Sequence, residues 1–162
     1  MIYPFNAVEA FKIALDIEEN GLRFYSEAAK KLPPGTVADL FVSLAQEEVI
    51  HKAKFSEILA DLPKERPSFF DPDNETDQYL KMMADINVFQ QGTATIDAAL
   101  ADVLTAKDAI RLAMTFEKDS VVFYVQLKNA SETAADKLSI DRLILEEAKH
   151  LRKLAIVYNS LL

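Results

Sequence analysis

The sequence predicts an all-α fold: an antiparallel four-helix bundle in which one long crossover joins the second helix to the third. Three observations indicate this fold. Apolar residues recur at steps of three and four through most of the 162 residues, only three glycines occur, and prolines stand where the expected helices end. With 50% hydrophobic residues the chain is long enough for one core, so we expect a single domain over residues 1–162.

The first expected hairpin covers residues 7–62. Its first helix runs from Ala7 to Lys31 and ends at the breaker Pro33-Pro34-Gly35. Its second helix runs from Val37 to Leu62 and ends before Pro63, which cannot continue the backbone hydrogen bonding. The short breaker predicts that the two helices pack side by side in opposite directions.

A long connection, residues 63–105, follows this hairpin. Its prolines and irregular pattern predict a linker with short helices near Thr76–Phe89 and Thr95–Leu104. A helix of about 26 residues is roughly 39 Å long, a distance that a linker of this length spans with ease. The crossover can therefore return along the full bundle, unlike the short loop of a simple up-down topology.

The second expected hairpin covers residues 106–160. Its helices are predicted at Lys107–Lys128 and Thr133–Tyr158, with a turn at Asn129–Ser131.

Composition and charge exclude several kinds of function. The net charge of -8, from 26 acidic and 18 basic residues, argues against binding to nucleic acid or to an anionic membrane. No cysteine is present, which excludes disulfides, thiolate zinc sites, iron–sulfur clusters and cysteine nucleophiles. Metal ligands in this chain must be oxygen and nitrogen atoms.

The N-terminus gives no sign of export. Met1–Val8 lacks a basic region followed by a long apolar stretch, and no later segment has 18 uninterrupted apolar residues. We expect a cytoplasmic protein.

An internal repeat relates the two hairpins. A shift of 99 residues aligns Ala14–Tyr25 with Ala113–Tyr124, and Leu44–His51 with Leu143–His150. Both histidines of the chain stand three residues after a glutamate, at equivalent places in the repeat. The identical pairs with metal-binding side chains are Glu18 with Glu117, Glu48 with Glu147, and His51 with His150.

The spacing of these residues predicts a metal site. Residues three apart share a helix face, so Glu48 and His51 can reach one ion together. Counted from the breaker, Glu18 and Glu48 stand at nearly the same height in the hairpin, within roughly 3 Å. In the second hairpin the heights of Glu117 and Glu147 agree less closely, but both residues lie near the middle of their helices, which is consistent with the same arrangement.

Charge supports the same interpretation. Four glutamates and two imidazoles would bring four negative charges into an apolar interior, a large cost unless two divalent cations compensate it. The set matches the pattern of di-iron and di-manganese carboxylate bundles. We expect two Fe ions per chain, with Mn or a mixed pair as the alternative. The competing interpretation is a duplicated bundle with surface carboxylates and two ordinary histidines.

The segments ALDIEENGLRFYSEAA and LAQEEVIHKAKF resemble the two halves of the rubrerythrin-type diiron domain, which has a ferritin-like fold. The resemblance covers nearly the whole chain. It implies that Glu18 and Glu117 bind the outer sides of the metal pair. It also implies that Glu48 and Glu147 bridge the pair and that the two histidines complete it.

Two departures from that family concern mechanism. Rubrerythrins usually carry a rubredoxin domain with a four-cysteine iron site, whereas this chain ends at Leu162 without a cysteine. We therefore expect an external electron donor, either rubredoxin-like or a flavin reductase, or ferrous iron itself. Rubrerythrin peroxidases also have an extra glutamate where this chain has Met114, and the symmetric place holds Leu15. The remaining ligand set is similar to the ferroxidase centre of bacterioferritin.

Further residues beside the ligands have two interpretations each. Tyr25 and Tyr124 stand seven residues after a ligand glutamate, so each either donates a hydrogen bond to a bridging carboxylate or simply packs in the core. Glu47 and Glu146 precede the bridging glutamates and could accept a hydrogen bond from an imidazole Nδ1. For these two we favour a solvated helix face.

Three functions remain after this reasoning. The first is a non-haem diiron oxidoreductase that reacts with peroxide or oxygen, as the rubrerythrin resemblance implies. The second is a ferroxidase or an iron-storage and iron-handling protein of bacterioferritin type, and the third is a metal-free structural bundle. For the first function we expect a homodimer that retains two irons per chain, whereas a large cage with many irons would favour the second.

Overall fold

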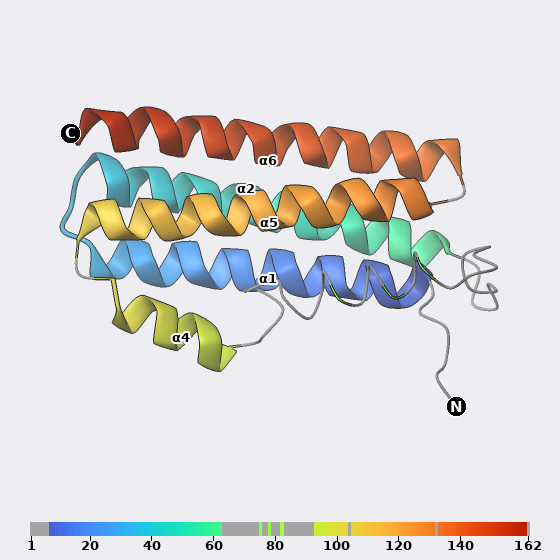
Figure 1. The fold of residues 1–162 in the computed structure, drawn as a ribbon, viewed down its shortest axis with the longest axis horizontal. Helices are drawn as coiled ribbons and strands as arrows, with labels where there is room; N and C mark the ends of the chain where they lie inside the picture. Colours follow the sequence, from blue (N-terminus) through green and yellow to red (C-terminus); the bar gives the residue numbers. More distant parts are fainter. Residues whose placement is uncertain are drawn as a thin grey trace.

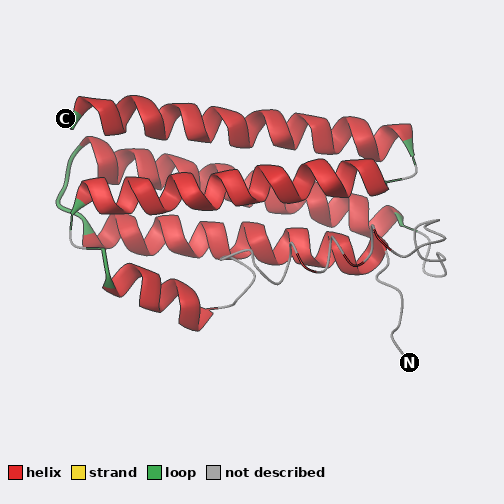
Figure 2. Ribbon diagram, viewed as in Figure 1, coloured by secondary structure: helices red, strands yellow, loops and turns green. Residues whose placement is uncertain are grey.

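A computed structural model describes residues 7–62, 75, 78, 82, 93–103, 105–131 and 133–161. Within these ranges every regular element is helical, and no strand occurs (Figure 2). The fold class predicted from the sequence is confirmed. The helices are α1 (Ala7–Lys31), α2 (Thr36–Asp61), α4 (Thr93–Ala101), α5 (Ala106–Ala130) and α6 (Ala134–Ser160).

Four long helices form the bundle, and a fifth, α4, lies against its outside (Figure 1). The pairs α1–α2 and α5–α6 are hairpins, and they meet through α1 against α5 and α2 against α6. Figure 1 shows α2 and α5 running in the same direction. Two parallel consecutive bundle helices require a crossover along the bundle, which agrees with the predicted long connection.

The first hairpin turns at Gly35. This residue has a φ of 153°, in the region that favours glycine because a side chain there is strained. The structure begins α2 at Thr36, one residue before the predicted start, and ends it at Asp61. The breaker in the sequence thus has a specific role, since it reverses the chain between α1 and α2.

The second hairpin differs from its prediction at the turn. Helix α5 continues through Asn129 to Ala130, both of which were predicted in the turn. It continues because Ser131 donates from its backbone N and its Oγ to the carbonyl of Leu127, at 3.0 and 2.8 Å, and so completes the last helical turn. Helix α6 then begins after Thr133, whose side chain accepts a hydrogen bond from the backbone N of Asp136.

The crossover returns to the bundle through α4. The predicted helix at Thr95–Leu104 is observed at Thr93–Ala101, while most of the one predicted at Thr76–Phe89 lies outside the described residues. Arg23 of α1 pairs with Asp97 of α4 at 2.9 Å. Lys31 adds a hydrogen bond to the carbonyl of Leu100. These contacts attach α4 to α1 near the start of α5.

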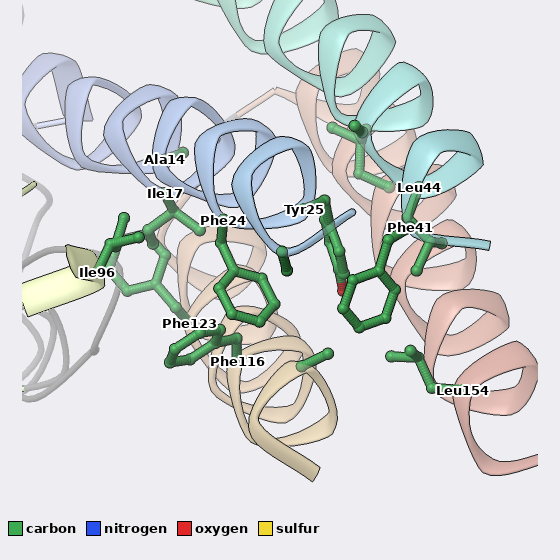
Figure 3. Close-up of a cluster of buried hydrophobic side chains, with 14 of the residues drawn as sticks. Ala14, Ile17, Phe24, Tyr25, Phe41, Leu44, Ile96, Phe116, Phe123 and Leu154 are labelled. Carbon is green, nitrogen blue, oxygen red and sulfur yellow. The ribbon is translucent and has the colours of Figure 1, made fainter. Parts of the chain in front are cut away.

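The largest fully buried side chains of the core are aromatic, and they pack among aliphatic residues inside the bundle (Figure 3). Phe24 of α1 and Phe116 of α5 meet edge to face, with ring centroids 4.9 Å apart and planes at 89°. Tyr25 also packs against Phe41, at 5.3 Å between centroids. This packing fixes the rotamers of the helix positions that neighbour the polar centre described below. In the described part of the chain, no helix has the length and apolarity needed to span a membrane.

Candidate metal centre

The six residues predicted as metal ligands all point into the bundle. Each is no more than 4% exposed, which is exceptional for glutamates and histidines unless they are paired. Helices α1 and α5 supply one glutamate each, and α2 and α6 supply a glutamate and a histidine each. They are Glu18 on α1, Glu48 and His51 on α2, Glu117 on α5, and Glu147 and His150 on α6.

The inner part of the centre consists of the two Glu-x-x-His pairs. One side-chain donor atom from each of these four residues lies within 4.8 Å of the others. Glu147 has one oxygen 2.7 Å from Nδ1 of His51 and the other 3.0 Å from Nδ1 of His150. Glu48 lies 3.5 Å from both Nδ1 atoms. Each of these glutamates therefore faces both histidines, the arrangement needed for a shared carboxylate.

The two remaining glutamates lie on opposite sides of this inner group. An oxygen of Glu18 is 3.5 Å from Nδ1 of His51, and an oxygen of Glu117 is 3.3 Å from Nδ1 of His150. The two imidazoles stack with centroids 5.2 Å apart and planes at 19°. The centre thus divides into two equivalent halves, each with its own histidine and its own outer glutamate.

The donor atoms fit a pair of cations. Three buried atoms, Oε2 of Glu18, Nδ1 of His51 and Oε1 of Glu147, have no hydrogen-bond partner. Nδ1 of His51 and Oε1 of Glu147 are only 2.7 Å apart, so their relative orientation, and not their separation, prevents a hydrogen bond between them. Unsatisfied donor atoms that converge in a buried site are the arrangement that a metal ion satisfies, and the oxygen and imidazole set suits iron or manganese.

The carboxylates crowd one another electrostatically. Burial and the negative charge of Glu147 raise the pKa of Glu117 to about 8, although His150 opposes the shift. Burial, followed by the charges of Glu147 and Glu18, raises the pKa of Glu48 well above its usual range. Without cations Glu48 and Glu117 therefore favour the protonated form, whereas contacts with the two imidazoles hold the pKa of Glu147 well below its usual range, against the effect of burial.

The pKa values of the two histidines are raised as well, but by the neighbouring carboxylates and against the effect of burial. Burial alone would lower the pKa of His150, but its contacts with Glu117 and Glu147 raise it to about 10. His51 is raised still further above its usual pKa by Glu147, Glu18 and Glu48, also against the effect of burial. Protons and metal ions consequently compete for the same nitrogen and oxygen atoms.

Two buried tyrosines hold the outer glutamates. Tyr25 of α1 donates its hydroxyl to Oε1 of Glu117, and Tyr124 of α5 donates its hydroxyl to Oε1 of Glu18. The hydrogen bonds cross between hairpins and do not go to the carboxylates that were expected to bridge. Figure 3 shows Tyr25 reaching from α1 into the interior among the core aromatics. Core packing and hydrogen bonding, which the sequence left as alternatives, occur together.

Glu47 is the residue that sequence reasoning placed wrongly. Its Oε2 lies 3.1 Å from Nε2 of His150, and its Oε1 accepts a hydrogen bond from Lys153 at 2.6 Å. The carboxylate is therefore a partner of an imidazole, through Nε2 instead of the Nδ1 considered above. Glu146 does lie on the helix surface, where it pairs with Lys149 at 2.8 Å. No signal in the sequence distinguishes the two glutamates, because they occupy equivalent positions of the repeat.

Some positions beside the centre carry small or apolar residues. Gly21 of α1 lies against Glu48, and a Cβ atom there would make an ordinary van der Waals contact, 3.4 Å from Cδ of Glu48. Met114, at the place of the extra glutamate of rubrerythrin peroxidases, and Leu15, at the symmetric place, are both partly buried against the core. No further carboxylate enters the centre from these two positions.

The fold and the centre together define a class of protein: a four-helix bundle with a buried cluster of carboxylates and histidines that could hold metal ions. The family model for Rubrerythrin matches residues 9–158, and the chain belongs to that family. Among solved structures, a candidate ferritin-like diiron-carboxylate protein from Thermotoga maritima is similar to it. That similarity has 22% identity and a TM-score of 0.71, over 98% of both chains, and it shows the fold. Comparison with curated proteins finds no match.

Proposed function

We propose that this protein is a non-haem diiron oxidoreductase that reacts with peroxide or oxygen. The observation that carries the proposal is the buried cluster in which two imidazole Nδ1 atoms face four carboxylates at 2.7 to 3.5 Å. Membership of the Rubrerythrin family supports iron as the metal. When bound, iron would supply the electron transfer that reduces peroxide or oxygen.

The protein's own contribution is to hold six ligands in place. Each half would use one histidine and one outer glutamate, while Glu48 and Glu147 would serve both halves. The hydroxyls of Tyr25 and Tyr124 fix the outer glutamates from the opposite hairpin. Because the ligands are almost fully buried, water has little access and electrostatic interactions in the centre are strong.

A pocket gives small molecules a route to the centre. It lies between α2 and α6, has a volume of about 350 Å³ and includes His51 in its lining. Apolar side chains, Ile50, Ile58 and Leu143, contribute to its walls. A diatomic or peroxide-sized oxidant fits easily in this volume, and the histidine brings it to the edge of the ligand set.

Stoichiometric oxidation tests the proposal. The metal-free protein is loaded anaerobically with two equivalents of Fe(II) and mixed with peroxide or oxygen in a stopped-flow instrument. We expect a fast rise in near-ultraviolet absorbance, and we expect Glu147→Ala to abolish it because this residue faces both histidines. Tightly bound iron without such a rise would refute the proposed reaction.

Iron handling of bacterioferritin type is the second candidate. It is favoured by Met114, an apolar residue at the place where the resemblance would require an extra carboxylate for peroxidase activity, and by Leu15, which is also apolar at the symmetric place. The two candidates differ in assembly and iron content. A homodimer with two irons per chain and turnover with a rubredoxin-like or flavin-dependent donor supports the oxidoreductase. A large particle that accumulates many irons per chain supports iron storage, with ferrous iron as the electron source.

A further inference from the structure

The internal repeat predicts that both histidines have the same surroundings, and the structure shows that they do not. The positions equivalent under the shift of 99 residues are Glu47 with Glu146, and Lys54 with Lys153. If the repeat were exact in structure, each glutamate would lie beside the histidine of the other hairpin, with a lysine beyond it. Only one half of the centre has that arrangement.

The half that contains His150 is closed on its outer side. Nδ1 of His150 faces the carboxylates, while Nε2 lies 3.1 Å from Glu47, a residue of the opposite hairpin. Lys153 holds Glu47 from the other side at 2.6 Å.

The half that contains His51 is open on its outer side. Glu146, the equivalent of Glu47, pairs with Lys149 at 2.8 Å, and Lys54 lies 3.6 Å from Glu57. Among the described residues, none forms a hydrogen bond or ion pair with Nε2 of His51. This imidazole instead lines the pocket of about 350 Å³ between α2 and α6.

A carboxylate on the outer nitrogen of a metal-bound imidazole has a known physical effect. It fixes the tautomer, holds the ring in orientation and increases the basicity of the nitrogen that binds metal. Loss of such a partner typically lowers metal affinity about 10- to 100-fold. The two halves of this centre therefore differ in the carboxylate partner of the histidine, which tunes metal affinity, although they would use the same types of ligand.

We propose that Glu47 and Lys153 are positioning residues that make the metal position beside His150 the tighter of the two. The position beside His51, which faces the pocket, binds more weakly and exchanges its ion with solution. The inference deepens the proposed function and rests on its two-metal centre. It assigns one resident ion and one exchangeable ion to a site whose ligands are symmetric.

Titration of the metal-free protein with Co(II) tests this assignment without any turnover. Visible absorbance and equilibrium dialysis should show two steps whose dissociation constants differ by about 10-fold or more. Glu47→Ala should weaken the tighter step by about 10- to 100-fold and bring the two steps together. Glu146→Ala, the matched control from the repeat, should leave both steps within about twofold. Lys153→Ala should act in the direction of Glu47→Ala, and its counterpart Lys54→Ala should not.

Nuclear magnetic resonance adds a readout that a purely structural effect would not produce. The chain has only two histidines, so ¹⁵N-histidine labelling of the Zn(II)-loaded protein gives two imidazole systems. One Nε2–H proton should exchange slowly with water, and it should be lost in Glu47→Ala and retained in Glu146→Ala. Glu47→Gln, which keeps an acceptor oxygen and loses the charge, should retain the slow proton and weaken binding less than alanine does.

The outcomes separate this inference from the proposed function. No binding of Co(II) or Fe(II) by the wild-type protein would refute both. Two equal binding steps, or equal effects of Glu47→Ala and Glu146→Ala, would refute only the difference between the two positions. Thermal unfolding of each metal-free variant identifies a variant that fails to fold, in which case Glu47→Gln and Lys153→Ala decide the question.

Discussion

The two hairpins, residues 7–62 and 106–160, supply the same types of side chain to the buried cluster and differ in what surrounds them. Both contribute a single glutamate, a Glu-x-x-His pair and a tyrosine hydroxyl. Around these, Gly21 in the first hairpin corresponds to Ser120 in the second. Glu47 reaches an imidazole and Glu146 does not. The comparison shows that the six clustered side chains stand at equivalent positions of the repeat, whereas the contacts of the residues next to them depend on local packing.

Metal binding should give the largest effect, because it involves both hairpins at once. At a free metal concentration 1,000 times its dissociation constant, each position contributes about 4 kcal/mol to the free energy of unfolding. For a chain of this size that corresponds to roughly 8 to 16 °C per position. Thermal unfolding with Co(II) and with chelator measures it, and Glu18→Gln or Glu117→Gln should each reduce the shift. Unfolding temperatures that are equal with and without metal would contradict it.

Replacement of each tyrosine tests whether the two crossed hydrogen bonds contribute equally to stability. Tyr25→Phe removes the hydroxyl that Glu117 accepts from, and Tyr124→Phe does the same to Glu18. Each should lower the free energy of unfolding by about 1 to 3 kcal/mol, because a buried acceptor loses its partner. Urea denaturation of the two metal-free variants measures the values, which should agree within about 0.5 kcal/mol. A large difference would show that the symmetry of the hydrogen bonds does not extend to their energies.

The stability of the metal-free protein should fall as pH rises. Glu117, with a pKa of about 8, and His150, with a pKa of about 10, both bind protons more tightly in the folded state than in the unfolded chain. The stabilisation that each of these two groups contributes is thus fully present below its unfolded pKa, and it is lost between pH 4.5 and 8 for Glu117 and between pH 6.5 and 10 for His150. We expect a loss of about 1 kcal/mol or more between pH 6.5 and 9.

Urea denaturation across this pH range measures the loss, and Glu117→Gln should reduce it. Metal affinity should increase as pH rises over the same range, because metal binding displaces these protons. Stability of the metal-free protein that rises over the same range would contradict the sign.

The smallest effect is expected where the hairpins differ by one small residue. Gly21→Ala places a Cβ at van der Waals distance from Glu48 and gains helix propensity, so it should stabilise the metal-free protein by up to about 1 kcal/mol. Ser120→Ala, its counterpart, removes a hydroxyl that donates to the carbonyl of Phe116 within the same helix. It should change stability by less than about 0.5 kcal/mol. Marked destabilisation by Gly21→Ala would show that Glu48 requires the full space.

Much of the fold and of the candidate site could be predicted from the helical periodicity of the sequence and from its internal repeat. The bounds Ala7–Lys31 of α1 were predicted as observed, because a proline pair ends the helix. The six ligand positions follow from a repeat in which both histidines share one spacing. The end of α5 did not follow, since Ser131 extends the helix by a local hydrogen bond. The role of Glu47 did not follow either, since Glu146 has the same place in the repeat and yet pairs with Lys149 on the helix surface.

The crossed hydrogen bonds of the tyrosines have a consequence for the independence of the two hairpins. Each hairpin's outer glutamate accepts a hydrogen bond from a hydroxyl of the other hairpin, so a lone hairpin would lack support for that glutamate. A buried carboxylate without such a partner is costly, so each hairpin depends on the other for the stability of its own polar interior.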